Sequence, residues 1–252
     1  MGGKGLRRIS KSAAVYIPFG ALLIIFLTII GTSGFLRVTE IEVVGALKYS
    51  EIDIAEASGI SQGDNLLFVD RTNAERMIRS AMPYVREARL TRIPPGSILI
   101  EVSESIAMAS IAHQFETLVI DSSGRVLQRA EIAPEGLIEI RGVSPGDVTE
   151  GSALRVRPGD ETTLQFLLDV LEAIDREGFQ DHVLYLDITN VSNIIFGYTE
   201  RYRVILGGPN NLKLKLSSLP GAIANVEARE SAAVTGTFRV DDSGEWRWNK
   251  DN

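Results

Sequence analysis

Residues 83–104 read Pro83-Tyr-Val-Arg-Glu-Ala-Arg-Leu-Thr-Arg-Ile-Pro-Pro-Gly-Ser-Ile-Leu-Ile-Glu-Val-Ser-Glu104, and this stretch decides the fold of the first half of the chain. Residues 85–93 predict one strand. Ile98, Ile100 and Val102 alternate with their neighbours and predict a second strand. The Pro-Pro-Gly run between the two predicts a tight turn, because proline and glycine interrupt regular structure.

The residues upstream predict one more strand and two helices. Residues 38–45 alternate between apolar and acidic side chains, which predicts a strand closed by glycine. Ser50 and Asp53 have the spacing of a capping box, and Thr72 and Glu75 have the same spacing before an amphipathic run that Pro83 stops. The predicted order over residues 38–104 is therefore β-α-α-β-β. We expect a small core of Ile41, Val43, Met77, Ile78, Leu90, Ile98, Ile100 and Val102.

The remaining residues, 107–252, predict a larger unit in which strands dominate. Residues 116–128 predict a hairpin, and the leucines of residues 164–174 predict a helix that ends at Gly178. Residues 212–219 fit a strand and a helix equally, and Pro220 disfavours a long helix. Further strands are expected at residues 137–141, 183–188, 194–196, 202–206, 233–240 and 245–248. The predicted fold class is α+β.

Charge is distributed unevenly along the chain. The formal net charge is −7, residues 1–11 carry +4, residues 12–36 carry none, and the rest carries −11. An uncharged run of 25 residues exceeds the roughly 20 helical residues that cross a bilayer, and it is longer than the apolar core of a signal peptide. We therefore predict a transmembrane helix at residues 12–36, with a basic tail (residues 1–11) in the cytoplasm and the acidic body outside. An acidic body also argues against a nucleic-acid ligand.

A search for catalytic chemistry finds no constellation that would support it. The sequence has no cysteine, which excludes disulfides and thiolate sites, and His113 and His182 have no second histidine at metal-binding spacing. Residues 207–211 lack the lysine of a phosphate loop, and residues 241–244 lack the acidic ligands of a calcium loop, so both predict turns. We expect no catalytic residue, no metal site and no cofactor.

Two segments are candidate contact surfaces. Arg86, Arg89 and Arg92 form a local basic cluster, which is either a solvated strand face or a contact for an acidic partner. The strand at residues 234–240 comes late in the sequence and is a candidate sheet edge that can accept a partner strand. Trp246 and Trp248 follow it as aromatic anchors, or else fold back onto their own sheet. The candidate partner-binding residues are Thr235, Thr237, Arg239, Trp246, Trp248, Arg86 and Arg89.

Several stretches resemble the FtsQ/DivIB family of bacterial cell-division proteins. Residues 35–45, 63–68 and 83–104 resemble the POTRA domain of that family. Val119-Ile-Asp-Ser-Ser-Gly-Arg-Val126 is similar to its next hairpin, and Leu137-Ile-Glu-Ile-Arg-Gly142 to the strand after it. Gly236-Thr-Phe-Arg-Val-Asp241 resembles the closing strand, with Phe238-Arg239 in place of the usual Ile-Asp. Together with the basic tip and the anchor, the order of these motifs extends the resemblance over nearly the whole chain.

The resemblance implies a non-enzymatic, single-pass scaffold of the divisome in the bacterial cytoplasmic membrane, concentrated at the septum. It implies a POTRA domain at residues 37–106 and a β-domain at residues 107–252. The implied partners are FtsB/DivIC-like and FtsL-like coiled-coil proteins, together with the septal synthase pair FtsW/FtsI. The alternatives are another POTRA-bearing membrane assembly or secretion factor, and an anchored cell-wall hydrolase. The first requires POTRA repeats or a strand-rich barrel, and the second requires an active site.

Overall fold

The computed structural model describes residues 11–32, 36–230 and 234–251, which form two compact units after an N-terminal helix. The first unit takes the residues up to Ala81 and Glu87–Ser103. The second unit takes Met82–Arg86 and the residues from Glu104 onward. Residues 82–86, which the predicted boundary at residue 106 placed in the first domain, thus belong to the second unit.

The N-terminal helix α1 spans Lys11–Thr32 and contains Pro18. Within the described ranges, no helix reaches the combination of length and hydropathy that marks a membrane span. The transmembrane helix predicted at residues 12–36 stays a prediction. Residues 33–35 of that segment and residues 1–10 of the predicted tail lie outside the described residues.

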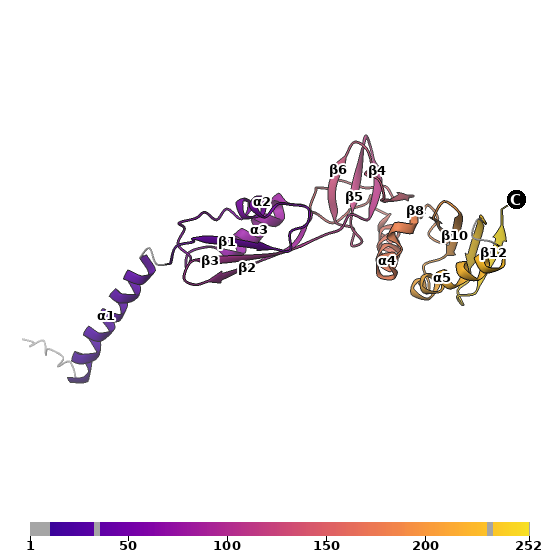
Figure 1. Ribbon diagram of the computed structural model, residues 1–252. Helices are drawn as coiled ribbons and strands as arrows, with labels where there is room; N and C mark the ends of the chain where they lie inside the picture. Colours follow the sequence, from indigo (N-terminus) through magenta and orange to yellow (C-terminus); the bar gives the residue numbers. More distant parts are fainter. Residues whose placement is uncertain (1–10, 33–35, 231–233, 252) are drawn as a thin grey trace, which may run out of the picture. The chain divides into compact units, whose positions relative to one another are not determined.

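The first unit has the predicted β-α-α-β-β order, with two helices beside a three-stranded sheet (Figure 1). The strand order is β1-β3-β2, and β1 pairs with β3 in parallel. A parallel pair needs a long crossover, which the two helices supply. The elements are β1 (Glu40–Val44), α2 (Glu51–Ala57), α3 (Arg71–Ala81), β2 (Val85–Ile93) and β3 (Ser97–Glu104).

The two helices of this unit begin differently from each other. Ser50 caps α2 as predicted, since its hydroxyl oxygen accepts from the Asp53 N–H at 3.1 Å. The capping box predicted at Thr72 is wrong, because α3 begins at Arg71 and the Asp70 carboxylate accepts from the Asn73 N–H at 3.1 Å. Glu75 instead accepts from the Leu90 N–H at 2.9 Å, which ties α3 to β2.

The core of the first unit follows the prediction except at two positions. Met77 is 37% exposed and Ile41 is only half-buried. The buried face of α3 follows Ala74 and Ile78, one helical turn apart, so Met77 falls at the margin of that face. The unpredicted side chains Ile54 and Leu66 complete the core. The correctly predicted members are Val43, Ile78, Leu90, Ile98, Ile100 and Val102.

The second unit is built on one nine-stranded sheet with the order β12-β11-β10-β9-β8-β7-β4-β5-β6. The sequence did not predict β4, a five-residue strand of small and apolar residues without alternation. The other strands match the expected segments within a few residues. The bounds are β4 (Ala109–His113), β5 (Glu116–Ile120), β6 (Val126–Ala130), β7 (Ile138–Arg141), β8 (Val183–Asp187), β9 (Ile194–Tyr198), β10 (Tyr202–Gly207), β11 (Gly236–Val240) and β12 (Trp246–Lys250).

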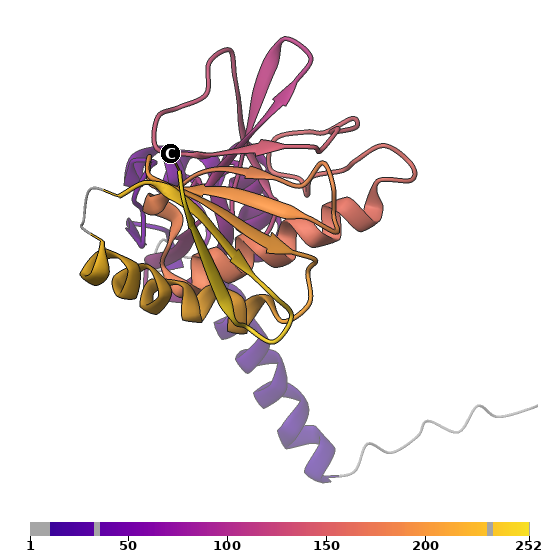
Figure 2. The ribbon, with the colours of Figure 1, turned by 90° about the vertical axis from the view of Figure 1, so that its right-hand side faces the viewer.

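Two long helices, α4 (Glu161–Glu177) and α5 (Leu212–Arg229), cover the same face of this sheet (Figure 2). Gly178 ends α4 as predicted, in the left-handed conformation at φ 71°. Helix α5 resolves the ambiguity at residues 212–219 and continues past Pro220. It does so because Leu212, Leu216, Leu219 and Ile223 form one continuous buried stripe against the sheet.

The two edge strands of the nine-stranded sheet differ in whether another segment pairs with their outer side. At the β6 end, the Val126 N–H donates to the Ser152 carbonyl at 2.8 Å, and the Gly151 N–H donates back to the Val126 carbonyl at 2.7 Å. Glu150 adds an acceptor for the Arg129 N–H at 2.7 Å. A loop therefore covers that edge. At the other end β12 is the last strand, and no described segment pairs with its outer side.

Candidate functional site

The open edge belongs to the C-terminal hairpin formed by β11 and β12. Its turn is held by Asp241, whose carboxylate accepts from the Ser243 N–H at 3.0 Å, the Ser243 hydroxyl at 2.6 Å and the Glu245 N–H at 3.1 Å. These bonds, led by the one from the Ser243 hydroxyl, lower the pKa of Asp241 below its ordinary value. An ionised turn residue therefore fixes the position of the edge strand.

Alternate residues of β12 offer their backbone to the open side. Asp241 pairs with Glu245, and Asp251 pairs with Thr235, each through a backbone hydrogen bond of 3.2 Å. In an antiparallel pair such hydrogen-bonded positions alternate, so the N–H and C=O groups of Arg247 and Asn249 point toward β11. Those of Trp246, Trp248 and Lys250 consequently point away from β11. These three residues are the template for an added strand.

The prediction that residues 234–240 form the sheet edge is wrong. Strand β11 lies inside the sheet, parallel to β10 on one side and antiparallel to β12 on the other. Thr235 accepts from the Asp251 N–H, and Thr237 pairs with Asn249, so their backbone groups are used within the hairpin. The alternation of faces is confirmed: Val234, Gly236, Phe238 and Val240 are buried. The late position of β11 in the sequence did not make it the edge strand, because β12 forms a tight hairpin with β11 and takes the edge position instead.

Trp246 and Trp248 both turn toward α5 on the inner face of the sheet. The Trp246 indole N–H donates to the Ser218 hydroxyl of α5 at 2.8 Å. The Trp248 ring lies 4.5 Å from the Phe238 ring and 5.8 Å from the Tyr202 ring, measured between centroids. The alternative in which the tryptophans fold back onto their own sheet is therefore correct. Both remain half-buried, so part of each ring is still available for contact.

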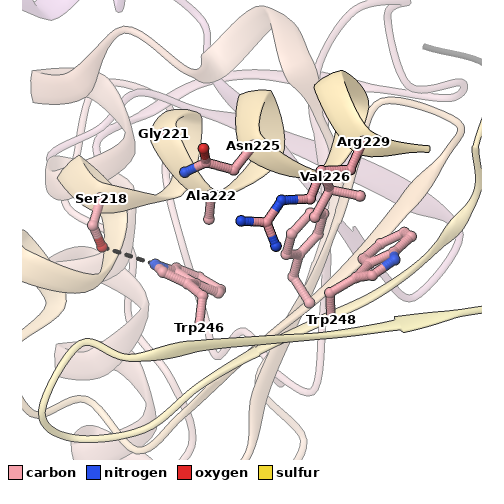
Figure 3. Close-up of a pocket in the computed structure, with 9 residues that line it drawn as sticks. Ser218, Gly221, Ala222, Asn225, Val226, Arg229, Trp246 and Trp248 are labelled. Carbon is pink, nitrogen blue, oxygen red and sulfur yellow. Dashed lines mark hydrogen bonds between the residues drawn. The ribbon is translucent and has the colours of Figure 1, made fainter. Parts of the chain in front are cut away.

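A groove of about 610 Å³ separates the middle of α5 from the two tryptophans (Figure 3). Its floor is aromatic, and on the helix side Gly221 and Ala222 leave space because their side chains are absent or small. Asn225 and Arg229 supply amide and guanidinium groups along the helix wall. The groove can thus take an apolar side chain and pair a nearby acceptor with Arg229.

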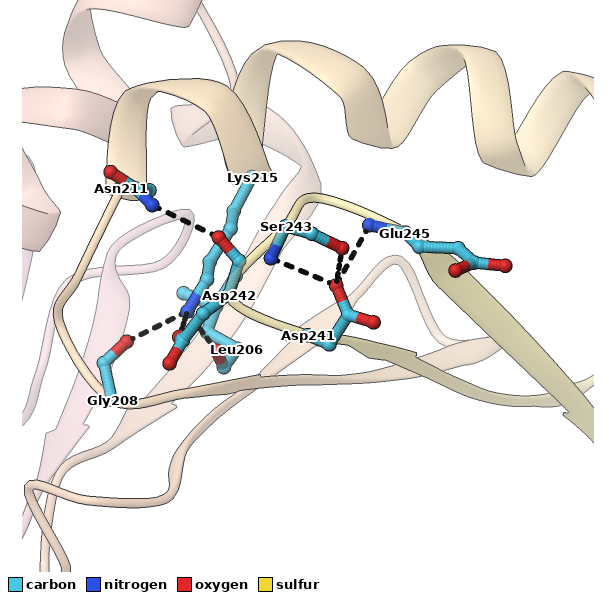
Figure 4. Close-up of polar contacts among 8 residues, drawn as sticks. All are labelled: Leu206, Gly208, Asn211, Lys215, Asp241, Asp242, Ser243 and Glu245. Atoms are coloured by element: carbon cyan, nitrogen blue, oxygen red, sulfur yellow. Dashed lines mark hydrogen bonds and ion pairs between the residues drawn. The ribbon is translucent and has the colours of Figure 1, made fainter.

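The N-terminal end of α5 is fastened by a fully buried lysine (Figure 4). The Lys215 ammonium donates to the carbonyls of Leu206 at 2.9 Å and Gly208 at 3.1 Å, and it contacts the Asp242 carboxylate at 3.0 Å. Asn211 adds a bond to the Asp242 carbonyl at 2.9 Å. The end of β10, the start of α5 and the β11–β12 turn are held together by this one cation.

The C-terminal end of α5 is fastened by a second polar cluster. The Tyr202 hydroxyl donates to Glu227 at 2.7 Å, and Arg201 forms an ion pair with the same carboxylate at 2.8 Å. Burial, followed by the bond to Glu227, raises the pKa of Tyr202 to about 12. The Tyr202 and Arg201 bonds lower the pKa of Glu227. Because α5 is fixed at both ends, the gap in its middle is a built feature of the unit.

The outer face of the same edge is basic. Arg203, Arg239 and Arg247 are all exposed on the face opposite α5, on β10, β11 and β12 respectively. Arg239 lies directly opposite Arg247 in the strand pairing. Like charges opposite each other in a sheet repel and are destabilising. Acidic side chains of a partner placed against this face would reduce the repulsion between the arginines. Of these three arginines, the sequence predicted Arg239 alone.

The predicted arginines Arg86 and Arg89 are not part of this edge. Residues three apart on a strand point to opposite faces, so Arg86, Arg89 and Arg92 cannot form one face of β2. Arg86 belongs to the second unit, beside Asp121 and Asp175, whereas Arg89 belongs to the first. Arg92 is half-buried and donates to the Val69 carbonyl within its own unit.

Several contributors to the site were missed from the sequence. Lys215 has a signal, because a helix through Leu212, Leu216 and Leu219 places residue 215 on the buried face. Arg247 also has a signal in the sequence, because it lies between Trp246 and Trp248 in a strand and so points to the opposite face of the sheet. The groove residues Asn225 and Arg229 had no local signal, because only the packing of α5 on β12 gives them a role.

The two histidines do not form a reactive site. His113 is half-buried at the end of β4, and His182 stacks on Tyr198 with centroids 5.4 Å apart. Within the residues that the structure describes, no three His, Cys, Asp or Glu side chains gather as a metal-binding group. The candidate site of the second unit is the β12 edge with the adjoining groove.

Comparison with known proteins agrees with this organisation. The family model of the POTRA domain, FtsQ-type, matches residues 36–105. Cell division protein DivIB of Clostridium tetani is 25% identical over 201 residues, covering 79% of this chain and 74% of that protein. Its namesake in Clostridium botulinum is 24% identical over 229 residues, covering 90% and 87%. Cell division protein FtsQ of Corynebacterium glutamicum is 32% identical over 112 residues, covering 44% and 50%.

The molecule is thus a POTRA-bearing protein whose second unit carries an open sheet edge. The matches to DivIB cover 79% and 90% of the chain and therefore extend over both units. The chain carries a POTRA domain of FtsQ type and is similar to the DivIB and FtsQ cell division proteins, and this similarity supports a role in cell division.

Proposed function

We propose that the chain is a non-enzymatic, membrane-anchored scaffold that gathers FtsB/DivIC-like and FtsL-like proteins and links them to the septal peptidoglycan synthases FtsW/FtsI. In this proposal residues 1–11 are cytoplasmic, residues 12–36 cross the cytoplasmic membrane, and the POTRA domain (37–106) and β-domain (107–252) lie outside, at the septum. The observation that carries the proposal is the open β12 edge beside the tryptophan groove.

The anchor is supported by the character of α1. Its described side chains between residues 16 and 29 include ten large apolar groups, each more than half exposed. A helix that is apolar on all sides belongs in hydrocarbon rather than in water. Three basic residues precede α1 and Lys11 is its first residue, which favours a cytoplasmic N-terminus. These exposed residues are Tyr16, Ile17, Phe19, Leu22, Leu23, Ile24, Ile25, Phe26, Leu27 and Ile29.

The chemistry of the edge defines the partner strand. Main-chain groups of Trp246, Trp248 and Lys250 would pair with it, which is strand addition. On the inner face its side chains meet the aromatic groove, and on the outer face they meet Arg239 and Arg247. We infer that the partner segment alternates large apolar with acidic residues. A short strand of this kind at the end of a coiled coil would fit an FtsB/DivIC-like protein.

The experiment compares two variants at one position. Lys250→Pro removes an outward N–H without touching the bonds between β12 and β11, since proline is tolerated at such an edge position. Lys250→Ala removes the side chain and its exposed ion pair with Glu230, but keeps the N–H. We expect Lys250→Pro to lose capture of the purified FtsB/DivIC-like partner, and Lys250→Ala to capture it as the parent does.

Folding of both variants is checked by tryptophan fluorescence during denaturant unfolding, because both tryptophans belong to this hairpin. A folded Lys250→Pro variant that captures the partner as well as the parent would place the binding site elsewhere. Thr237→Pro is not a suitable test, because the Thr237 N–H lies on the β12 side and its loss would break the hairpin itself.

A further inference from the structure

Two large apolar side chains of the first unit, Leu67 and Phe68, are exposed to solvent although the residues on either side of them are buried. Leu67 is 48% exposed and Phe68 is 77% exposed. The residues on either side, Leu66 at 1% and Val69 at 7%, are packed in the core. An apolar pair between two buried residues is held in position, and its exposure has a cost that contact with an apolar phase would remove.

The turn that carries the pair is closed by its own hydrogen bonds. The Phe68 N–H donates to the Asn65 carbonyl at 2.9 Å, and the Leu67 N–H donates to the Asn65 side-chain oxygen at 3.0 Å. Just before it, the Ser61 N–H donates to the Asp64 carboxylate at 2.9 Å. These bonds fix the backbone that carries both apolar side chains.

The same loop is bonded to the segment that follows α1. The Leu66 N–H donates to the Leu36 carbonyl at 2.8 Å, the Val38 N–H donates to the Asp64 carbonyl at 2.8 Å, and Arg37 bridges to Asn65. The pairing is antiparallel. As the loop passes from Asp64 to Leu66, it therefore runs back toward the end of the chain from which α1 comes, and the turn that carries Leu67 and Phe68 begins beside Leu36 and Arg37, at that end.

Chain length limits how far this pair can be from α1. Thr32 and Leu36 are separated by four Cα–Cα steps, which span about 15 Å at full extension. The interfacial layer of a bilayer adds roughly 5–7 Å on each side of its hydrocarbon core. We propose that Leu67 and Phe68 insert into the lipid surface on the outer side of the membrane that α1 crosses. This inference rests on the anchor in the proposed function.

The contact would be apolar rather than electrostatic. Asp64 and Asp70 flank the pair, and both carboxylates already accept backbone N–H groups. Acidic neighbours give no attraction to anionic lipids, so the contact is expected with uncharged lipids as well. Its consequence is that the first unit is held to the membrane at two points, which restricts the orientation of this unit relative to the bilayer.

The chain has no cysteine, so single-cysteine labelling can test the contact in the full-length protein. An environment-sensitive dye is placed by Phe68→Cys, by Leu47→Cys and by Leu22→Cys, and each protein is reconstituted into phosphatidylcholine vesicles. Leu47 is the matched control, because it is 81% exposed in the same unit and follows β1 at the end away from Leu36. Leu22 lies in the middle of α1 and reports the anchor.

With quencher lipids in the vesicles, the dye at positions 22 and 68 should lose more than half of its emission, and the dye at position 47 should keep it. Loss at position 22 with position 68 unaffected would overturn the lipid contact and leave the anchor standing; a protein partner would then be the better explanation of the exposed pair. If position 22 is not quenched, the anchor itself fails, and the lipid contact fails with it.

Discussion

Lys215 is the residue on which the geometry of the open edge depends most. A buried ammonium with three acceptors is stable only where all of its donors are used; here two acceptors lie at the end of β10 and just after it, and the third lies in the β11–β12 turn. Its carboxylate partner, Asp242, is 70% exposed in its side chain, so the ion pair is not sealed from water. The two carbonyl bonds are consequently the part of the contact that is hardest to replace.

Replacing Lys215 with methionine should lower the free energy of unfolding of the second unit by about 1–3 kcal/mol, because the Leu206 and Gly208 carbonyls lose their donor. Lys213→Met is the matched control, since Lys213 is exposed two residues earlier, and it should change stability by less than about 0.5 kcal/mol. Denaturant unfolding followed by tryptophan fluorescence measures both. Equal stability of the Lys215→Met variant and the parent would contradict this role.

Among the elements, α5 shows how the groove is maintained. Its apolar stripe packs on the sheet along most of its length. At Gly221 and Ala222, however, the helix has no large side chain to pack against Trp246 and Trp248. The polar clusters at its two ends prevent the helix from closing down on the gap. The distance between α5 and β12 therefore depends on the Tyr202–Glu227–Arg201 cluster as well as on Lys215.

This cluster predicts a loss of stability at alkaline pH. The pKa of Tyr202 is about 12 in the fold and near 10 when unfolded. Between these values the unfolded state binds fewer protons than the native state, so stability falls as the pH rises through this range. Tyr202→Phe should remove that part of the slope. If the free energy of unfolding of the parent and of Tyr202→Phe falls equally steeply with pH, Tyr202 is not the group responsible.

The elements of the fold were largely predictable, and the failures have physical causes. Alternation and turn residues located nearly every strand, because one face of each sheet is buried. Strand β4 was missed, since Ala-Ser-Ile-Ala-His carries little alternation. Residues 212–219 were ambiguous because leucines at 212, 214 and 216 satisfy a strand, and only the packing of α5 on the sheet selects the helix. Strand order, and with it the true edge, arises from long-range pairing that no local pattern encodes.

At the scale of the whole molecule, the chain is two cores joined by a shared strand. Residues 85–86 of β2 belong to the second unit, and residues 87–93 belong to the first. Each unit nevertheless has its own buried cluster, with Ile100 fully buried in the first and Phe238 nearly so in the second. We expect two unfolding transitions that can be separated by the choice of probe.

Ile100→Asp should abolish the transition of the first unit, since a carboxylate in that core costs several kcal/mol. Both tryptophans lie in the second unit, so fluorescence should still report one cooperative transition there, while circular dichroism loses the contribution of the first unit. Ile93→Asp is the control, because Ile93 is 43% exposed on β2 of the first unit, and it should leave both transitions in place. Collapse of the fluorescence transition in Ile100→Asp would show that the units do not fold independently.

The loop from Glu150 to Ser152 that covers β6 has a further consequence for stoichiometry. Among the residues that the structure describes, the uncovered edge of the nine-stranded sheet is that of β12, so titration with a donated strand should saturate at one partner per chain. Copies of the chain cannot polymerise through this sheet, because a second copy could meet β12 only with its own β12, and the resulting closed pair has no edge left to grow from. Because the β6 edge is covered, the sheet can accept a partner strand at β12 but cannot grow into a fibre.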